Sequence, residues 1–255
     1  MNDETREQYA RTRLLLGQDG LDRLRQARVA VFGVGGVGGY VVEALARSGV
    51  GALDLIDDDK VCLSNLNRQI IATRSTLGMY KVDAAVARVR DIDPEIVVRT
   101  YKTFYTPETA DQFDFTQYSY VVDAIDTVTG KLSLVMQAKA AGVPIICSMG
   151  AGNKLDPSRF EVADLYETSV CPLARVMRAE CRKRGVDHLK VVYSKEPPLA
   201  PIAEEKTEET APAGAPARPG TPKKRAPGSV AFVPSAAGLV LAGEVIRDLS
   251  GVSQK

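Results

Sequence analysis

The stretch RVAVFGVGGVGGYVVEALARSG, residues 28–49, decides the fold class of this chain. Residues 28–32 form a short apolar run, the glycine-rich GVGGVG follows at 33–38, and residues 40–48 carry the spacing of an amphipathic helix. A strand, a glycine-rich turn and a helix in this order are typical of a dinucleotide-binding unit, in which the helix N-terminus faces phosphate. The glycines permit a tight turn, close approach of phosphate and close helix packing. The residues expected at the phosphate are Gly33, Gly35, Gly36 and Gly38.

Short apolar runs and helical stretches alternate from this unit up to residue 148. Strands are predicted at 52–57, 95–100, 120–126 and 145–148, and helices at 81–91 and 131–141. This alternation favours a parallel sheet, because each helix returns the chain to the start of the next strand. The expected fold class is α/β, a Rossmann-like and mostly parallel sheet with helices on both faces.

The sequence after residue 150 is less regular and divides at a proline-rich segment. A helix at 173–184 and a strand at 189–194 are expected before that segment. Residues 197–228 hold eight of the 14 prolines and no aromatic residue, which is typical of a flexible loop. Residues 230–249 are apolar again and predict a strand followed by a closing helix. The expected organisation is a domain at 1–196, a loop at 197–228, and a C-terminal extension at 229–255 that completes the same domain.

Composition and charge exclude several classes of function. The 255 residues are 45% hydrophobic and 25% charged, as in ordinary globular proteins, and the formal net charge of +1 gives no overall attraction to polyanions. No signal-peptide pattern opens the chain and no apolar run is long enough for a membrane span, so we expect a cytoplasmic protein without a membrane partner. The four cysteines are isolated, which excludes a zinc site built from C-x-x-C pairs.

Polar residues after the second expected strand extend the nucleotide site. Asp57 follows the last loop glycine by 19 residues, close to the spacing of an acid that binds ribose. Arg68 and Lys81 can neutralise a triphosphate, and Asn65 and Gln69 can orient its oxygens. The loop and Asp57 alone also fit an NAD-binding redox protein. The polar run at 65–69 disfavours hydride chemistry.

Together these residues resemble the E1-like family, whose members adenylylate carboxylates. The matched positions are Gly33, Gly35, Gly36, Gly38, Asp57, Asp59, Asn65, Arg68, Gln69 and Lys81. The resemblance implies an E1-like adenylation fold that binds ATP with Mg²⁺ and releases pyrophosphate. It also implies that Asp126 binds the Mg²⁺ and that Arg13 reaches ATP across a homodimer. The cations of such a site offset the repulsion between an attacking carboxylate and the anionic α-phosphate.

One branch of that family matches a longer part of the chain, up to about residue 193. The segments RTRLLLG at 11–17, SNLNRQI at 64–70, YSYVVDAIDTVTGK at 118–131 and the run at 148–178 resemble the tRNA threonylcarbamoyladenosine (t6A) dehydratases. The resemblance implies a tRNA carrying t6A as substrate, whose threonyl carboxylate is adenylylated and then closes a five-membered ring, ct6A, as AMP leaves. Intramolecular closure needs no enzyme cysteine. A monovalent cation site is left open.

A basic region follows the expected nucleotide site and offers a surface for RNA. Residues 175–195 contain seven basic and two acidic residues, so the near-neutral total charge conceals a basic patch. Such patches bind nucleic-acid phosphates, although a solvated helix face has the same composition. The residues predicted to bind tRNA are Arg178, Arg182, Lys183 and Arg184.

Other functions remain open from the residues alone. The alternative enzyme activates the C-terminal glycine of a ubiquitin-like sulfur carrier, and a nucleotide-binding scaffold without turnover is a further class. Cys171 or Cys181 would be the nucleophile in a ubiquitin-type activation, but neither has an identified base. His188, the only histidine, lies in a charged stretch typical of solvated residues. A sulfur-transfer or acceptor protein is left open as a partner.

Overall fold

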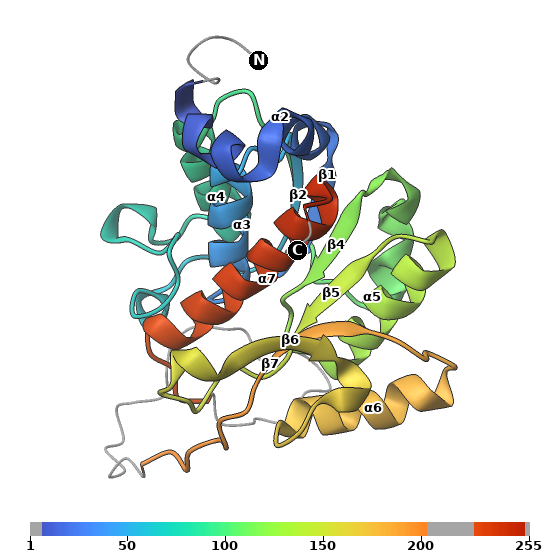
Figure 1. Ribbon diagram of the computed structural model, residues 1–255. Helices are drawn as coiled ribbons and strands as arrows, with labels where there is room; N and C mark the ends of the chain where they lie inside the picture. Colours follow the sequence, from blue (N-terminus) through green and yellow to red (C-terminus); the bar gives the residue numbers. More distant parts are fainter. Residues whose placement is uncertain (1–6, 203–226, 253–255) are drawn as a thin grey trace.

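The computed structural model describes residues 7–202 and 227–252, which surround a seven-stranded sheet (Figure 1). The strand order is β3-β2-β1-β4-β5-β7-β6. All neighbours are parallel except β6, which runs antiparallel to β7. The strands are β1 (Arg28–Phe32), β2 (Ala52–Ile56), β3 (Val97–Tyr101), β4 (Tyr120–Asp123), β5 (Ile145–Ser148), β6 (Phe160–Asp164) and β7 (Lys190–Ser194). The α-helices are α2 (Ala10–Gln26), α3 (Gly38–Arg47), α4 (Lys81–Ile92), α5 (Val128–Ala141), α6 (Pro172–Lys183) and α7 (Phe232–Ser250).

Strand β1 lies in the middle of the sheet because it is apolar on both faces. Val29 and Val31 join the hydrophobic core on one face, while Ala30 and Phe32 join the core on the other. Continuous apolar runs are typical of parallel strands that are covered on both sides. Strand β1 is hydrogen-bonded to β2 on one side and to β4 on the other, so neither of its edges is exposed.

Two layers of helices cover the sheet (Figure 1). The first layer consists of α2, α3, α4 and α7, which contribute to one core with the strands. The second consists of α5, α6 and the short 3-10 turns between β3 and β4. The predicted fold class, a mostly parallel α/β sheet with helices on both faces, is confirmed.

The C-terminal extension differs from the expectation. The strand predicted near the start of 230–249 is wrong, because residues 227–231 form no strand and α7 begins at Phe232. Val233, Ala237 and Leu241 recur at helical spacing and are fully buried, so packing against α3 determines the helix. Pro234 is tolerated because the first turn of a helix needs no intrahelical N–H from it.

The sequence pattern also does not predict α2 or β6. Most residues of α2 are polar, its backbone kinks at Gly17, and its buried positions are limited to Gly20, Leu21 and Leu24. Strand β6 is half-buried along its whole length, so it lacks an apolar pattern. Of the predicted loop at 197–228, residues 203–226 lie outside the described part of the chain. None of the described helices is long and apolar enough to cross a membrane.

Candidate functional site

The glycine-rich loop lies where the order of the strands reverses, after the carboxyl ends of β1 and β4. In open α/β sheets this point is where ligands bind, because neighbouring connections leave on opposite faces. Gly33 has a φ of +90°, and a Cβ atom there would lie 2.7 Å from the carbonyl oxygen of Ala124. The first loop glycine therefore provides a left-handed backbone and lets the loop after β1 touch the loop after β4.

The other loop glycines differ in how much space surrounds them. A Cβ atom on Gly38 would lie 1.8 Å from the carbonyl oxygen of Gly33, so only glycine fits there. A Cβ on Gly35 would have a single neighbour, the Gln69 amide nitrogen, at 3.8 Å. No side chain therefore fits at Gly38, where α3 begins, whereas the backbone at Gly35 is free of close neighbours. A backbone that binds phosphate through its N–H groups needs such free space.

Asp57 fixes the loop from the end of β2. Its Oδ2 accepts the Val34 N–H at 2.8 Å, and its Oδ1 accepts the Asp59 N–H at 2.9 Å. Burial raises the pKa of Asp57 above its ordinary value, although Lys81 and the two N–H donors act in the opposite direction. The carboxylate can still accept hydroxyl donors from a ribose, since each oxygen has a second lone pair.

Lys81, the first residue of α4, places a buried positive charge beside these carboxylates. Its Nζ lies 2.7 Å from Asp59 Oδ2 and 3.8 Å from Asp57 Oδ1, and its side chain is 7% exposed. Asp57, Asp58 and Asp59 are the only carboxylate cluster close enough for a shared metal ion within residues 7–202 and 227–252. Lys81 offsets part of the negative charge of these carboxylates.

The polar run after β2 folds against the same loop. The buried Asn65 accepts the Cys62 N–H at 3.1 Å and so shapes its own 3-10 turn. The aliphatic part of Arg68 packs beside Gly36, and its Nη1 donates to Ser64 O and Asn67 Oδ1, both at 2.9 Å. Gln69 is different, because its buried Oε1 has no hydrogen-bond partner among the residues that the structure describes. A buried acceptor of this kind, next to Gly35, is suited to a donor from a ligand.

Asp126 lies on the loop after β4, two residues beyond the contact between Ala124 and Gly33. The side chain is exposed, and no hydrogen bond or ion pair joins its carboxylate to the described residues. Mg²⁺ is usually held by one or two carboxylates together with substrate phosphates, so a single free carboxylate at this place fits that ion.

A buried ion pair beneath this loop was not anticipated from the sequence. Lys131 and Asp123 are both fully buried, and Lys131 Nζ lies 3.0 Å from each Asp123 oxygen and 2.7 Å from Ser148 O. Asp123 Oδ1 also accepts the Ile125 N–H at 3.2 Å. The pair joins the ends of β4 and β5 and holds the loop that carries Asp126. The sequence offers one signal for this pair, an acid at the end of an apolar strand and a lysine eight residues later.

The structure does not bring Arg13 to the glycine loop within one chain. Arg13 is exposed on α2, and the neighbouring Tyr9 donates to Ala46 O at the end of α3. The glycine loop precedes the other end of α3, a helix of ten residues or about 15 Å. Within one chain, Arg13 and the glycine loop therefore lie at opposite ends of α3.

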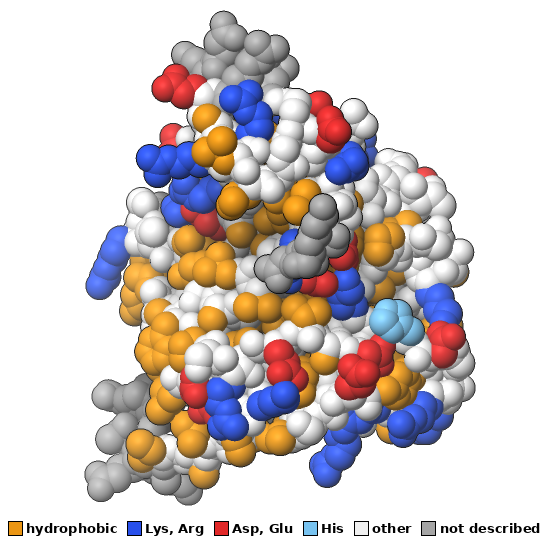
Figure 2. All heavy atoms as spheres, in the orientation of Figure 1, with side chains coloured by type: hydrophobic (Ala, Val, Ile, Leu, Met, Phe, Trp, Pro, Cys, Tyr) orange, Lys and Arg blue, Asp and Glu red, His pale blue; other side chains and the backbone are white. Residues whose placement is uncertain are grey.

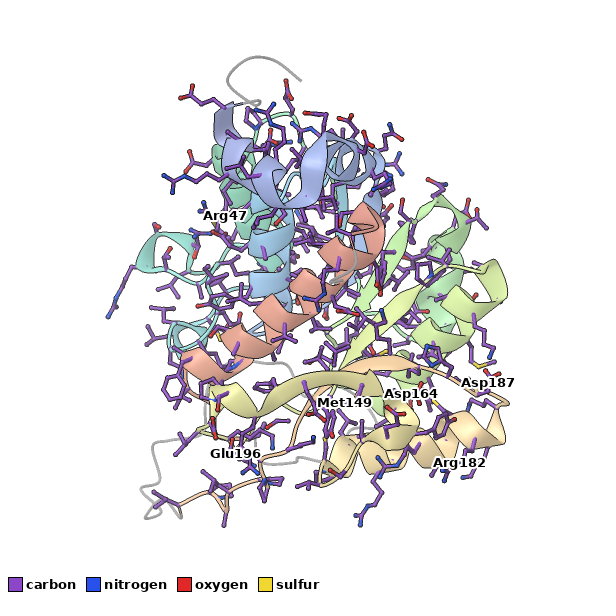
Figure 3. The ribbon with its side chains drawn as sticks, in the orientation of Figure 1. Arg47, Met149, Asp164, Arg182, Asp187 and Glu196 are labelled. Atoms are coloured by element: carbon purple, nitrogen blue, oxygen red, sulfur yellow. The ribbon has the colours of Figure 1, made fainter. Side chains whose placement is uncertain are left out.

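The four residues predicted to bind tRNA lie on or directly after α6, but each has a local contact. Arg178 donates to Thr168, Arg182 lies 5.1 Å from the ring centre of Tyr166, and Glu180 pairs with both Lys183 and Arg184. Arg182 and Asp187 line a surface hollow of about 580 Å³ at the far end of α6 (Figure 3). Arg175 is exposed on the first turn, and no ion pair involves it within the described ranges.

The residues considered for thioester or base chemistry do not form a pair. Cys171 and Cys181 are buried in the core between α5, α6 and the sheet, and burial raises the pKa of the Cys181 thiol. His188 is exposed and its Nδ1 contacts Asp164 Oδ2 at the end of β6. No histidine therefore lies in position to activate either thiol, since His188 is the only one in the chain.

Helix α7 covers the glycine loop from a distant part of the sequence. A Cβ atom on Gly36 would lie 3.3 Å from Pro234, and one on Gly238 would lie 2.4 Å from Val37 O. Neither Pro234 nor Gly238 belongs to the predicted site. The sequence signal for this contact is the run of small residues PSAAG at 234–238, because small side chains let two backbones approach closely.

Comparison with known proteins gives relatives over nearly the whole chain. The sequence signature of the ThiF family matches residues 8–255. The tRNA threonylcarbamoyladenosine dehydratase of Bacillus subtilis is 45% identical over 243 residues, which cover 95% of this chain and 94% of that protein. The protein of the same name from Escherichia coli is 40% identical over 178 residues, 70% of this chain and 66% of that protein. The crystal structure of the E. coli enzyme in complex with ATP has a TM-score of 0.83 at 30% identity, covering 98% of this chain and 96% of that one.

Proposed function

The chain belongs to the ThiF family, and from this premise we propose that it is an ATP-dependent tRNA threonylcarbamoyladenosine dehydratase. The observation that carries the proposal is the similarity to the B. subtilis enzyme, which extends over nearly the full length of both chains. ATP binding is supported by the glycine loop, by the unpaired Gln69 acceptor beside it, and by the similar E. coli structure in complex with ATP.

The proposed reaction removes the elements of water from the modified nucleoside in two steps. A threonyl carboxylate oxygen of a tRNA carrying t6A bonds to the α-phosphorus of ATP, and pyrophosphate leaves. A nucleophilic atom of the same modification then bonds to the acyl carbon and loses its proton, while AMP leaves with the electron pair of the broken C–O bond. The product is cyclic ct6A. Holding both groups in one nucleoside favours closure over hydrolysis.

The site residues take the following proposed roles. Lys81 and Arg68 offset the charge of the phosphates, while the backbone N–H groups at the start of α3 bind phosphate oxygens. Asp57 accepts hydroxyl donors from the ribose. Asp126 would hold Mg²⁺, which when bound reduces the negative charge of the phosphates.

A homodimer is part of the proposal, because Arg13 lies too far from the loop of its own chain. Leu14 and Leu15 beside it are 84% and 81% exposed, and Phe232 and Leu239 on α7 are about half exposed. Figure 2 shows hydrophobic side chains gathered over the face that α7 crosses. Exposed apolar surface of this kind is typical of a protein interface.

The tRNA surface is proposed to run along α6, with Arg175 nearest the site. A Cβ on Gly150, two residues beyond β5, would lie 4.0 Å from Leu173 Cβ, so the first turn of α6 adjoins the edge where the nucleotide site lies. Arg178, Arg182, Lys183 and Arg184 extend the basic surface away from it. A tRNA substrate also agrees with the expected cytoplasmic location.

The test measures AMP and pyrophosphate release with ATP and either tRNA carrying t6A or a ubiquitin-like sulfur-carrier protein. We expect release and a loss of water mass from the nucleoside only with the tRNA. Lys81→Met should reduce the rate about 100-fold or more, because a charge that offsets the phosphates is lost. Lys102→Met is the matched control, since Lys102 is half exposed and pairs with Asp83 on the surface. Release only with the carrier protein would replace the proposal by the alternative enzyme.

A further inference from the structure

At the edge of the candidate site, Asn153 joins its own loop by hydrogen bonds to two other segments of the chain, at Leu199 and at Gly228. It lies in the loop after β5 and has a left-handed backbone with a φ of 57°, which asparagine tolerates better than most residues. Its N–H donates to Gly228 O at 2.8 Å, and its Oδ1 accepts the Gly228 N–H at 2.7 Å. Its carbonyl accepts the Leu199 N–H at 2.8 Å. Residue 153 is therefore bonded to the segments that follow β7 and precede α7.

The three residues after Asn153 hold this loop in place. Lys154 donates from Nζ to Glu196 O, and the Glu196 carboxylate accepts the N–H groups of Leu155 and Asp156, both at 2.9 Å. Lys154 and Glu196 are both buried, and burial lowers the pKa of Lys154. In Figure 3, Glu196 lies well apart from Arg182 at the far end of α6. The loop that presents Asn153 is thus anchored independently of residues 227–229.

Residues 227–229, which we call the strap, connect Asn153 to the phosphate side of the site. Gly228 is bonded to Asn153, and Ser229 O accepts Asn67 Nδ2 at 3.0 Å. Asn67 Oδ1 in turn accepts Arg68 Nη1 at 2.9 Å. A continuous series of hydrogen bonds therefore joins the loop after β5 to the guanidinium group of Arg68, whose aliphatic part packs beside Gly36.

This series of hydrogen bonds ends at one of the two acceptors of the Arg68 guanidinium group. Asn67 is exposed, and the bond to Ser229 O is the only one that its amide nitrogen donates within the described residues, so this bond sets the direction in which Oδ1 faces Arg68. The second acceptor of Arg68, Ser64 O, belongs to the 3-10 turn Leu63–Asn65, which lies just before Asn67 in the chain. We propose that Asn153 is a positioning residue, which orients Arg68 for the phosphates of ATP through the strap and Asn67. This rests on the proposed function only as far as ATP binding.

The test is calorimetric titration of the full-length protein with ATP. Asn153→Gly removes the side-chain acceptor but keeps the left-handed backbone and both backbone hydrogen bonds. Asn153→Asp keeps an acceptor oxygen at the same place and is the matched control. We expect Asn153→Gly to weaken ATP binding about fivefold, the effect of one hydrogen bond, and Asn153→Asp to stay within about twofold of the original protein. Thermal unfolding midpoints of both variants should stay within a few degrees of the original protein, since at most one hydrogen bond is lost.

A double-variant cycle separates positioning from a general loss of structure. Asn67→Ala interrupts the series at its other end, so Asn153→Gly should weaken ATP binding no further in that background. Unchanged affinity in Asn153→Gly, an equal loss in Asn153→Asp, or additive losses in the double variant would each overturn the proposal. Since no tRNA is present, failure of the dehydratase assignment would leave these results unaffected.

Discussion

The nucleotide-binding half of the molecule, residues 28–131, and the C-terminal half, residues 145–250, build their parts of the site differently. In the first half, Gly33 and Asp57 directly follow strands and Lys81 begins a helix. In the second half the contacts join distant segments, such as Asn153 with Gly228, 75 residues apart. Local spacing therefore identifies the candidate residues of the first half, whereas those of the second half emerge only from pairing between segments.

The largest effect is expected from breaking the local geometry of the first half. Gly38→Ala would place a Cβ atom 1.8 Å from Gly33 O, so the loop has to move, and we expect a loss of about 3 kcal/mol in stability together with ATP binding. Gly35→Ala has room, with one neighbour at 3.8 Å, and should keep its melting temperature while losing ATP affinity. Thermal unfolding and ATP titration of both variants test this. Equal melting temperatures for Gly38→Ala and Gly35→Ala would contradict the claim that only Gly38 is too tightly packed for a Cβ atom.

A smaller effect is expected from pH, through the raised pKa of Asp57. The folded protein binds more protons than the unfolded chain between the ordinary and the raised pKa, so stability without ATP decreases as pH rises through that interval, by at most about 1.4 kcal/mol per pH unit. ATP affinity should change in the opposite direction and increase, because the ionised carboxylate accepts hydroxyl donors. Denaturant unfolding and ATP titration from pH 4 to pH 7 measure both.

Asp57→Asn is the control for that dependence. Both trends should become flatter in this variant, because asparagine does not titrate and still offers one acceptor oxygen. If ATP affinity still depends on pH in the same way in Asp57→Asn, then another titratable group causes that dependence.

The smallest effect is expected on the RNA side of the C-terminal half. Arg175→Ala should weaken tRNA binding severalfold and reduce its salt dependence by about one ion, because Arg175 has no carboxylate partner within the described residues. Lys183→Ala should have less effect, since Lys183 pairs with Glu180 at 2.6 Å. Binding measured at several salt concentrations tests this. Equal losses of tRNA affinity in the two variants would mean that the ion pair with Glu180 does not keep Lys183 from binding phosphate.

The two halves also differ in how far sequence reasoning reaches. The strands, the glycine loop and the acid at position 57 follow from apolar runs and from spacing, because parallel strands end at a common edge of the sheet. Strand β6 and helix α2 do not follow, since their half-buried or mostly polar sequences have no clear period. The start of α7 does not follow from the sequence either, because a short apolar run before Pro234 suits a strand or a buried helix equally.

Sequence alone determined the α/β class, the nucleotide loop and the resemblance to carboxylate-activating enzymes, because these depend on residues close together in the chain. Only the tertiary structure decided that Lys131 and Asp123 pair beneath the loop after β4, that α7 covers Gly36, and that Arg13 lies far from its own loop. These contacts join elements whose separation along the chain carries no periodic signal. The positions of these contacts depend on which helices pack on each face of the sheet.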